Sequence, residues 1–180
     1  MIVWLNGTFG AGKTTTAGEL TALLPGARIF DSEYVGFMLR HVLDDVPHDD
    51  FQEWTPWRSL TVATARDVLA FVGGTLVIPQ TVLVEQYWDE LAAGFAAAGV
   101  PVRHYVLHTD PATLRARILG DTEEIRAWRL DHVEPYARAF DAWLSGRATV
   151  VPTTGRPAAE VARWIAGDLL RPGETQAARG

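Results

Sequence analysis

The chain has 180 residues, a length that suits one domain, and its 48% hydrophobic and 21% charged residues are typical of an ordinary globular protein. A net charge of −6 and the absence of cysteine exclude a broad basic surface for nucleic acid, a disulfide framework and a thiolate metal site. No apolar run is long enough to span a bilayer and no signal peptide is visible, so we expect a cytoplasmic protein without an integral membrane segment. The sequence leaves open whether it is a monomer or a homodimer.

The first predicted element is a short buried strand over residues 2–5, and residues 7–14 behind it read Gly-Thr-Phe-Gly-Ala-Gly-Lys-Thr. This is the spacing of a P-loop. A helix is predicted over 15–24, because its apolar residues recur at helical spacing. A glycine-rich turn between strand and helix points backbone N–H groups and the positive end of the helix dipole at one spot, which predicts a polyphosphate site.

Lys13 is the only lysine of the chain, and the other fifteen basic residues are arginine. An ammonium and a guanidinium are not equivalent on a phosphate, so a lone lysine here favours a phosphate site over a turn that merely packs strand on helix. We expect Lys13 to reach the outer phosphates of ATP and Thr14 to bind Mg²⁺. The other expected nucleotide contacts from this loop are Gly7, Phe9, Gly10, Ala11, Gly12 and Thr15.

The remaining predicted strands are short apolar runs, and the helices between them show apolar residues at helical spacing. The strands are expected over residues 28–30, 76–78, 102–107 and 149–151. The helices are expected over residues 32–43, 57–72, 85–98, 111–119, 122–144 with a kink at Pro135, and 157–170. Residues 44–56 form a polar connection rich in acids and aromatics, and a tail is expected over 173–180, after a single domain of residues 1–172.

Strands and helices alternate along the whole chain, which predicts an α/β fold with a five-stranded parallel sheet and helices on both faces. Ligands of such sheets bind at the carboxyl ends of the strands. Those ends carry the P-loop, Asp31, Gln80, the pair 109–110 and the run 152–154. We therefore expect Thr154 beside the nucleotide.

Asp31 and Glu33 follow the second strand, next to the expected γ-phosphate. A carboxylate there can accept the proton of an acceptor hydroxyl or hold water on Mg²⁺, and we expect Asp31 to do so, with Glu33 second. The alternative is that Asp31 only caps the following helix. The two roles are compatible.

Arginines and aromatics supply the other candidates. Segment 115–130 is the expected lid, in which Arg117, Arg126 or Arg129 meets the phosphates, with Arg117 assigned to nucleotide binding and Arg129 to catalysis. Trp57 and Arg58, at the end of the polar connection, are expected in the acceptor pocket rather than the core. Trp54 is an even choice between ligand and core, Trp4, Trp143 and Trp164 are assigned to the core, and the five histidines show no metal-binding spacing.

With these motifs in view, the chain resembles the tunicamycin-resistance ATP-binding proteins, a family of small bacterial P-loop proteins. The likeness runs over residues 2–14, 31–40, 50–52, 57–58 and 77–81, and it covers the first hundred residues best. More distantly the chain is similar to chloramphenicol phosphotransferase, shikimate kinase and the nucleoside monophosphate kinases. The resemblance implies sheet order 2-3-1-4-5, a mobile lid and an acceptor region over about 32–60. The acceptor contacts that it and the motifs indicate are Asp31, Glu33, Phe37, Arg40, Gln52, Trp57, Arg58 and Gln80.

The expected function is therefore phosphoryl transfer from ATP to a small nucleoside-like antibiotic of the tunicamycin type. One departure favours a rival, because those kinases carry an acid at the end of the third strand where this chain has Gln80. The rival is a non-catalytic protein that sequesters the drug when loaded with ATP, and a third alternative is a kinase for an ordinary metabolite. Asp31 and Glu33 favour an enzyme.

Overall fold

The protein is described by a computed structural model that covers residues 1–120 and 123–171. Its strands are β1 (Ile2–Asn6), β2 (Ala27–Ile29), β3 (Thr75–Ile78), β4 (Val102–His108) and β5 (Thr149–Pro152). The longer helices are α1 (Lys13–Leu23), α2 (Glu33–Arg40), α3 (Thr55–Val72), α4 (Glu85–Ala97), α5 (Pro111–Leu119), α6 (Glu123–Asp131), α7 (Val133–Ala139) and α9 (Ala158–Leu170). Short turns of helix are η1 (Phe51–Glu53), η2 (Phe140–Leu144) and α8 (Ser145–Arg147).

The five strands form one parallel sheet in the order β2-β3-β1-β4-β5, which confirms the expected fold and strand order. In the centre, Ile2 of β1 is paired with Leu76 of β3 on one side and with Val102 of β4 on the other. Because the strands are parallel, their carboxyl ends lie along one edge of the sheet, where the P-loop follows β1.

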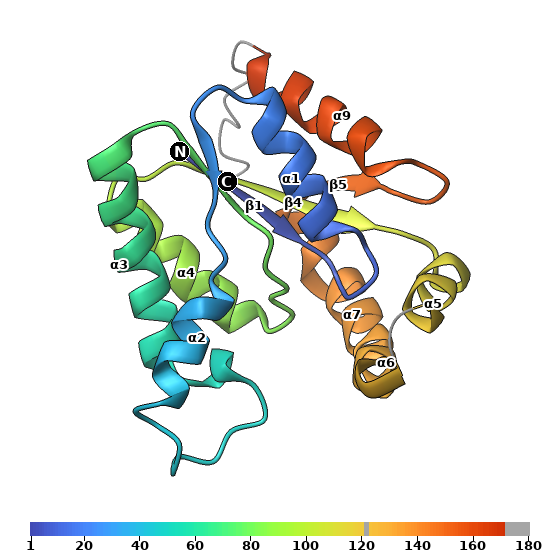
Figure 1. Ribbon diagram of the computed structural model, residues 1–180, viewed down its shortest axis with the longest axis horizontal. Coiled ribbons are helices and arrows are strands. Elements are labelled where there is room, and N and C mark those ends of the chain that lie inside the picture. The colour runs from blue at the N-terminus through green and yellow to red at the C-terminus, as the bar shows by residue number, and fades with distance from the viewer. Residues whose placement is uncertain (121–122, 172–180) are drawn as a thin grey trace.

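Successive side chains of a strand point to opposite faces, and the two faces of this sheet carry separate cores. Val3 and Leu5 pack with α1 and α9, whereas Ile2 and Trp4 pack with α3, α4 and the segment from α7 to η2. Figure 1 shows this three-layer arrangement, with α1 and α9 on one side of the sheet and α3, α4 and α7 on the other.

Local sequence explains where helices begin. The carboxylate of Asp110 accepts a hydrogen bond from the backbone N–H of Thr113 (2.9 Å), and Pro111 occupies the first turn of α5. Helix α3 likewise has a proline in its first turn, and it ends at Gly73, whose φ is 69°.

Two helices differ from the sequence-based expectation. Helix α2 ends at Arg40 rather than at residue 43, since the acids at 44 and 45 oppose the helix dipole and a proline follows at 47. The long helix expected over 122–144 is interrupted at His132, not at Pro135. Pro135 lies in the first turn of α7, where a proline is tolerated. It has no N–H to donate to the carbonyl of Asp131, four residues earlier, and its ring crowds that carbonyl, so α6 and α7 cannot form one continuous helix.

Among the described residues, no helix combines the length and the apolar composition that crossing a membrane requires. The tail expected over 173–180 lies outside the described residues, as do residues 121 and 122 of the expected lid.

Candidate functional site: the P-loop and the cavity in front of it

The P-loop, residues 7–14, connects the end of β1 with the start of α1. Gly12 is the N-cap of α1 with a left-handed backbone (φ 92°), and no side chain caps the helix. Gly7 has φ 134°, and a Cβ there would lie 2.7 Å from the carbonyl oxygen of Leu107. The first N–H groups of a helix have no partner within it, so this uncapped N-terminus offers backbone donors and a positive dipole end to an anion.

The start of the P-loop is fixed to the segment that follows β3. The buried Asn6 side chain accepts hydrogen bonds from the backbone N–H of Gly7 (2.8 Å) and of Val82 (3.0 Å), and it donates to the Val82 carbonyl (2.9 Å). Thr81 donates its hydroxyl to the Gly7 carbonyl (2.7 Å). These bonds hold the loop rigidly before any ligand arrives.

The Lys13 ammonium lies inside the loop and donates to the carbonyls of Gly7 (2.9 Å) and Thr8 (3.0 Å). Burial lowers the pKa of Lys13 to about 7, the Glu33 carboxylate raises it in part, and the Arg129 guanidinium lowers it further. A cation whose two hydrogen bonds go to neutral carbonyls fits a site that an anionic phosphate completes.

The P-loop faces a cavity of about 920 Å³. The lining comes from the P-loop with the start of α1, helix α2, the segment 49–53, the segment after β3 with the start of α4, helix α5, helix α6 with His132, and the segment after β5 with the start of α9. Its charged and polar lining residues outside the P-loop include Glu33, Arg40, Asp49, Asp50, Gln52, Glu53, Gln80, Tyr87, Arg117, Arg129, His132 and Arg156.

Acidic side chains dominate the part of the cavity that faces the P-loop from α2 and segment 49–53. Burial raises the pKa of the Glu33 carboxyl, the nearby Asp31 carboxylate raises it further, and Lys13 opposes both. Burial likewise raises the pKa of Asp50, although its hydrogen bond from the Gln52 backbone N–H lowers it in part. Arg40 brings a cation to this side, with its guanidinium carbon 5.6 Å from the centre of the Phe37 ring.

Asp31 itself does not line the cavity. Its carboxylate accepts a hydrogen bond from the backbone N–H of Glu33 (3.0 Å), the first residue of α2, although the N-cap position itself is Ser32. Glu33, two residues further, is therefore the carboxylate that lines the cavity, and the charge of Asp31 raises the pKa of its side chain.

Trp128 of α6 and His132, which follows that helix, pack against Phe9 of the P-loop as an aromatic cluster. The ring centres of Phe9 and Trp128 are 4.5 Å apart, and those of Phe9 and His132 are 5.2 Å apart. The Arg129 guanidinium carbon lies 5.6 Å from the Phe9 ring centre. This cluster brings the expected lid arginine to the phosphate side of the cavity.

Arg117 of α5 joins two of the loops at the sheet edge. Its guanidinium donates to the carbonyl of Gly10 in the P-loop (3.1 Å) and to that of Thr153 after β5 (3.1 Å). Arg117 also lines the cavity, so it couples the position of the P-loop to the wall on the β5 side.

Most of the residues expected from the sequence line this cavity. They are Phe9, Gly10, Ala11, Gly12, Lys13, Thr14, Thr15, Glu33, Phe37, Arg40, Gln52, Gln80, Arg117 and Arg129. Gly7 and Thr154 do not: Gly7 is buried behind the loop, and Thr154 is hydrogen-bonded to Asp110 (2.9 Å), while its neighbour Thr153 takes the cavity position.

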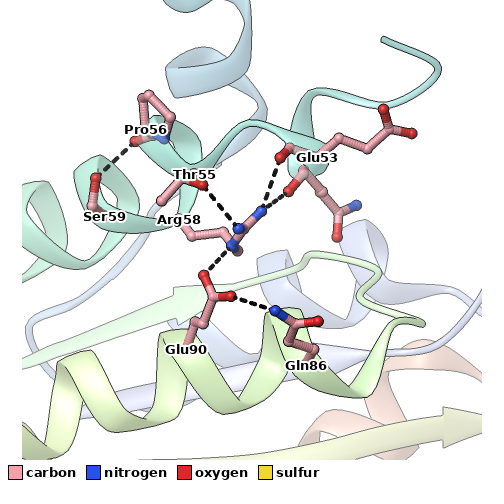
Figure 2. Close-up of polar contacts among 8 residues, drawn as sticks. Glu53, Thr55, Pro56, Arg58, Ser59, Gln86 and Glu90 are labelled. Atoms are coloured by element: carbon pink, nitrogen blue, oxygen red, sulfur yellow. Dashed lines mark hydrogen bonds and ion pairs between the residues drawn. The ribbon is translucent and has the colours of Figure 1, made fainter.

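The expectation that Trp57 and Arg58 lie in the acceptor pocket rather than the core is wrong, because both are buried in the protein and neither lines the cavity. Trp57 is fully buried, and its indole N–H donates to the Ser32 carbonyl (3.0 Å). Arg58 is buried between α3 and α4, behind the cavity wall, and pairs with Glu90 (Figure 2). Trp54 is also buried, with its ring 4.0 Å from that of His48.

Several cavity residues were not singled out from the sequence. Asp49, Asp50 and Glu53 come from the acid-rich connection, whose composition was the available signal. Trp128 lay within the expected lid and Thr153 within the run 152–154, whereas Tyr87, His132 and Arg156 carried no such signal, because helical spacing alone does not show which turn of a helix faces a ligand.

Magnesium would be held here mainly through phosphates. Within residues 1–120 and 123–171, no group of three His, Asp or Glu side chains could hold a metal ion. The exposed Thr14 lines the cavity at the start of α1, so its hydroxyl can serve as a ligand of a nucleotide-bound Mg²⁺. The donor set of the site, backbone N–H groups with Lys13, fits a nucleoside triphosphate with its metal.

A family model described as an AAA domain matches residues 2–120. No curated protein matches the sequence. Among solved structures, the chain is similar to the tunicamycin resistance protein of Deinococcus radiodurans, with a TM-score of 0.77 and 24% identity over 93% of this chain and 94% of that one. It is also similar to a sugar kinase from a Janibacter species, with a TM-score of 0.66 and 18% identity over 93% of each chain.

The Mycobacterium tuberculosis APS kinase CysC, solved in complex with AMPPNP and APS, gives a TM-score of 0.58 and 19% identity over 95% of this chain and 97% of that chain. All three identities are below 25%, so these similarities show a shared fold. That fold is the one of P-loop kinases, as the resemblance of the sequence implied.

Proposed function

Since the chain belongs to this AAA-domain family and has the fold of P-loop kinases, we propose that it transfers the γ-phosphoryl group of ATP to a hydroxyl of a small, nucleoside-like antibiotic of the tunicamycin type. The observation that carries the proposal is one cavity lined both by the P-loop with Lys13 and by the Glu33 carboxylate opposite it. A phosphate donor and an acceptor hydroxyl can therefore meet in one space.

The chain supplies a group for each part of the transfer. Lys13 and the backbone N–H groups of the P-loop hold the phosphates, and Arg129 brings a second cation to the side where charge develops. Glu33 accepts the proton of the acceptor hydroxyl, and burial beside Asp31 makes it more basic than an exposed carboxylate. The Thr14 hydroxyl would hold a nucleotide-bound Mg²⁺, which would neutralise phosphate charge.

The lining opposite the P-loop favours an acceptor without negative charge. Four carboxylates line the cavity there, those of Glu33, Asp49, Asp50 and Glu53. The basic side chains on this side are one guanidinium, that of Arg40, and the imidazole of His132. Four carboxylates in a partly desolvated space repel a phosphate or sulfate on the acceptor. A neutral, hydroxyl-rich molecule such as tunicamycin meets no such repulsion, and a protein with this fold is named for resistance to it.

The second candidate is a protein that binds ATP and sequesters the drug without chemistry. Gln80 favours it, because this amide stands at the end of β3 where kinases carry an acid. Both ends of its side chain are engaged, with Ser32 donating to its oxygen (3.0 Å) and its nitrogen donating to the Thr81 carbonyl (3.2 Å). Gln80 thus brings no charge to a metal.

Mass spectrometry separates the two candidates. Tunicamycin is incubated with the protein, ATP and Mg²⁺, and in parallel with Lys13→Met. The proposal expects one added phosphoryl group on the drug with the wild-type protein and none with the variant. Binding of tunicamycin without any phosphorylated product would support sequestration, and absence of both would reject the antibiotic as the ligand.

A further inference from the structure

Arg58 is a buried cation that the transfer described above does not use. Its side chain is 7% exposed and lies between α3 and α4, at one end of a second groove of about 420 Å³. Its Nε donates to the Glu90 carboxylate at 2.5 Å, and Gln86 of α4 donates to the other oxygen of that carboxylate (3.2 Å). Figure 2 shows this group of side chains.

The terminal nitrogens of the same guanidinium donate hydrogen bonds to η1 and to the start of α3. One terminal nitrogen donates to the carbonyls of Gln52 and Glu53 (3.3 Å for Glu53), and the second donates to the Thr55 hydroxyl (3.3 Å) (Figure 2). Arg58 therefore ties η1, the start of α3 and α4 together with one planar group.

Gln52, which accepts from Arg58, also connects η1 to residues that line the cavity. Its backbone N–H donates to the Asp50 carboxylate (2.8 Å), and its side-chain nitrogen donates to the same carboxylate (3.3 Å) and to the Thr81 carbonyl (3.0 Å). Thr81 in turn holds the Gly7 carbonyl, to which Lys13 also donates. A continuous set of hydrogen bonds thus runs from Glu90, outside the cavity, to the P-loop.

We propose that Arg58 is a positioning residue that holds segment 49–53, and with it Asp50 and Gln52, in place to bind the acceptor. The segment has only one turn of helix of its own, so its backbone depends on outside donors for a fixed conformation. Arg58 acts without touching the acceptor, since it lies behind the wall that segment 49–53 forms.

An arginine is required for this role because the guanidinium offers five donors in a fixed plane. The plane also packs over Tyr87, with 4.4 Å between the guanidinium carbon and the ring centre, and Tyr87 lines the cavity. A lysine can keep a cation near Glu90 or near the carbonyls of η1, but its single ammonium cannot join both.

Hydrogen exchange tests the positioning role without any acceptor. Arg58→Met removes all donors and Arg58→Lys removes the fork, and Arg66→Gln is the matched control, because Arg66 is an exposed arginine of the same helix, paired with Asp67. We expect the hydrogen-exchange rate of peptides covering 49–54 to rise about tenfold or more in both Arg58 variants and to stay unchanged in the control. Each lost hydrogen bond to a charged donor lowers local stability enough to change the exchange rate by about this factor. Unchanged exchange there would overturn the proposal, and Arg58→Lys decides it if Arg58→Met does not fold.

Binding affinities test the consequence for the acceptor, which rests on the proposed function. Tunicamycin should bind the Arg58 variants about tenfold more weakly or worse, whereas AMPPNP affinity should stay within about threefold of wild type, because the P-loop keeps its own bonds. Equal losses of both ligands would mean that Arg58 serves only general stability and would overturn the proposal. Failure of tunicamycin to bind the wild-type protein would instead reject the proposed acceptor, and the exchange experiment would still decide the positioning role.

Discussion

The buried lysine of the P-loop makes nucleotide binding a proton-coupled event. Burial lowers the pKa of Lys13 to about 7. Bound phosphates surround the ammonium with negative charge and return the pKa toward its ordinary value, so binding raises the pKa and takes up a proton. With a pKa of about 7, roughly one tenth of Lys13 is neutral at pH 6, one half at pH 7 and nine tenths at pH 8.

We therefore predict uptake of about 0.9 proton per AMPPNP bound at pH 8, and a fall in affinity that approaches tenfold per pH unit above pH 8. The uptake is measured by titration calorimetry at pH 8 in two buffers with different ionisation heats. The second ionisation of a phosphate has a pKa of about 6, so the phosphates are largely ionised before pH 8 is reached.

Two variants serve as controls for this titration. Lys13→Met should bind AMPPNP weakly through the backbone donors alone and without proton uptake, whereas Glu33→Gln should retain the uptake because the lysine is unchanged. Proton uptake below about 0.2 in the wild-type protein at pH 8 would refute the reasoning, since it would mean that Lys13 is charged before the phosphates arrive.

Three further predictions follow from the cavity and its walls. Glu33→Gln should lower turnover about 10²–10⁴-fold with AMPPNP affinity retained, because general-base catalysis contributes about that factor; an unaffected single-turnover rate would exclude Glu33 as the base. Gly36→Ala should lower the free energy of unfolding by about 1–3 kcal/mol in a urea titration, because its Cβ would lie 2.6 Å from the Phe51 ring, while the control Gly18→Ala, with no atom within 4 Å, should not lose stability. Phe9→Ala should speed hydrogen exchange in α6 of the nucleotide-free protein, because it removes the rings' contact with the P-loop; equal protection in both proteins would show that α6 is held by other contacts.

Much of the fold was predictable because its signals are local. Apolar runs of strand length alternate with helical periodicity, and sheet order followed from the resemblance that the P-loop and its flanks carry. The break at His132 was expected three residues too late. A proline disrupts the helical turn that precedes it in the sequence. Pro135 therefore lies in the first turn of α7, and the helix is interrupted before it, at His132.

The site was predictable where a side chain's role follows from backbone geometry, as in the P-loop. It was less so where the role depends on which face of a helix points inward. Trp57 and Arg58 follow a polar segment, yet both point into protein, and the burial of Arg58 depends on Glu90, which is 32 residues away in the sequence. Asp31 was ranked ahead of Glu33 for the same reason, since only the fold shows that Glu33, and not Asp31, lines the cavity.

The central claim is that one cavity holds the nucleotide phosphates and the acceptor hydroxyl together, between Lys13 and Glu33. A crystal structure with AMPPNP, Mg²⁺ and tunicamycin tests it most directly. We predict the terminal phosphate within hydrogen-bond distance of the Lys13 ammonium, and a drug hydroxyl about 2.6–3.2 Å from the Glu33 carboxylate, on the phosphate side of segment 49–53. Tunicamycin bound elsewhere, or bound here with no hydroxyl directed at the terminal phosphate, would contradict the account.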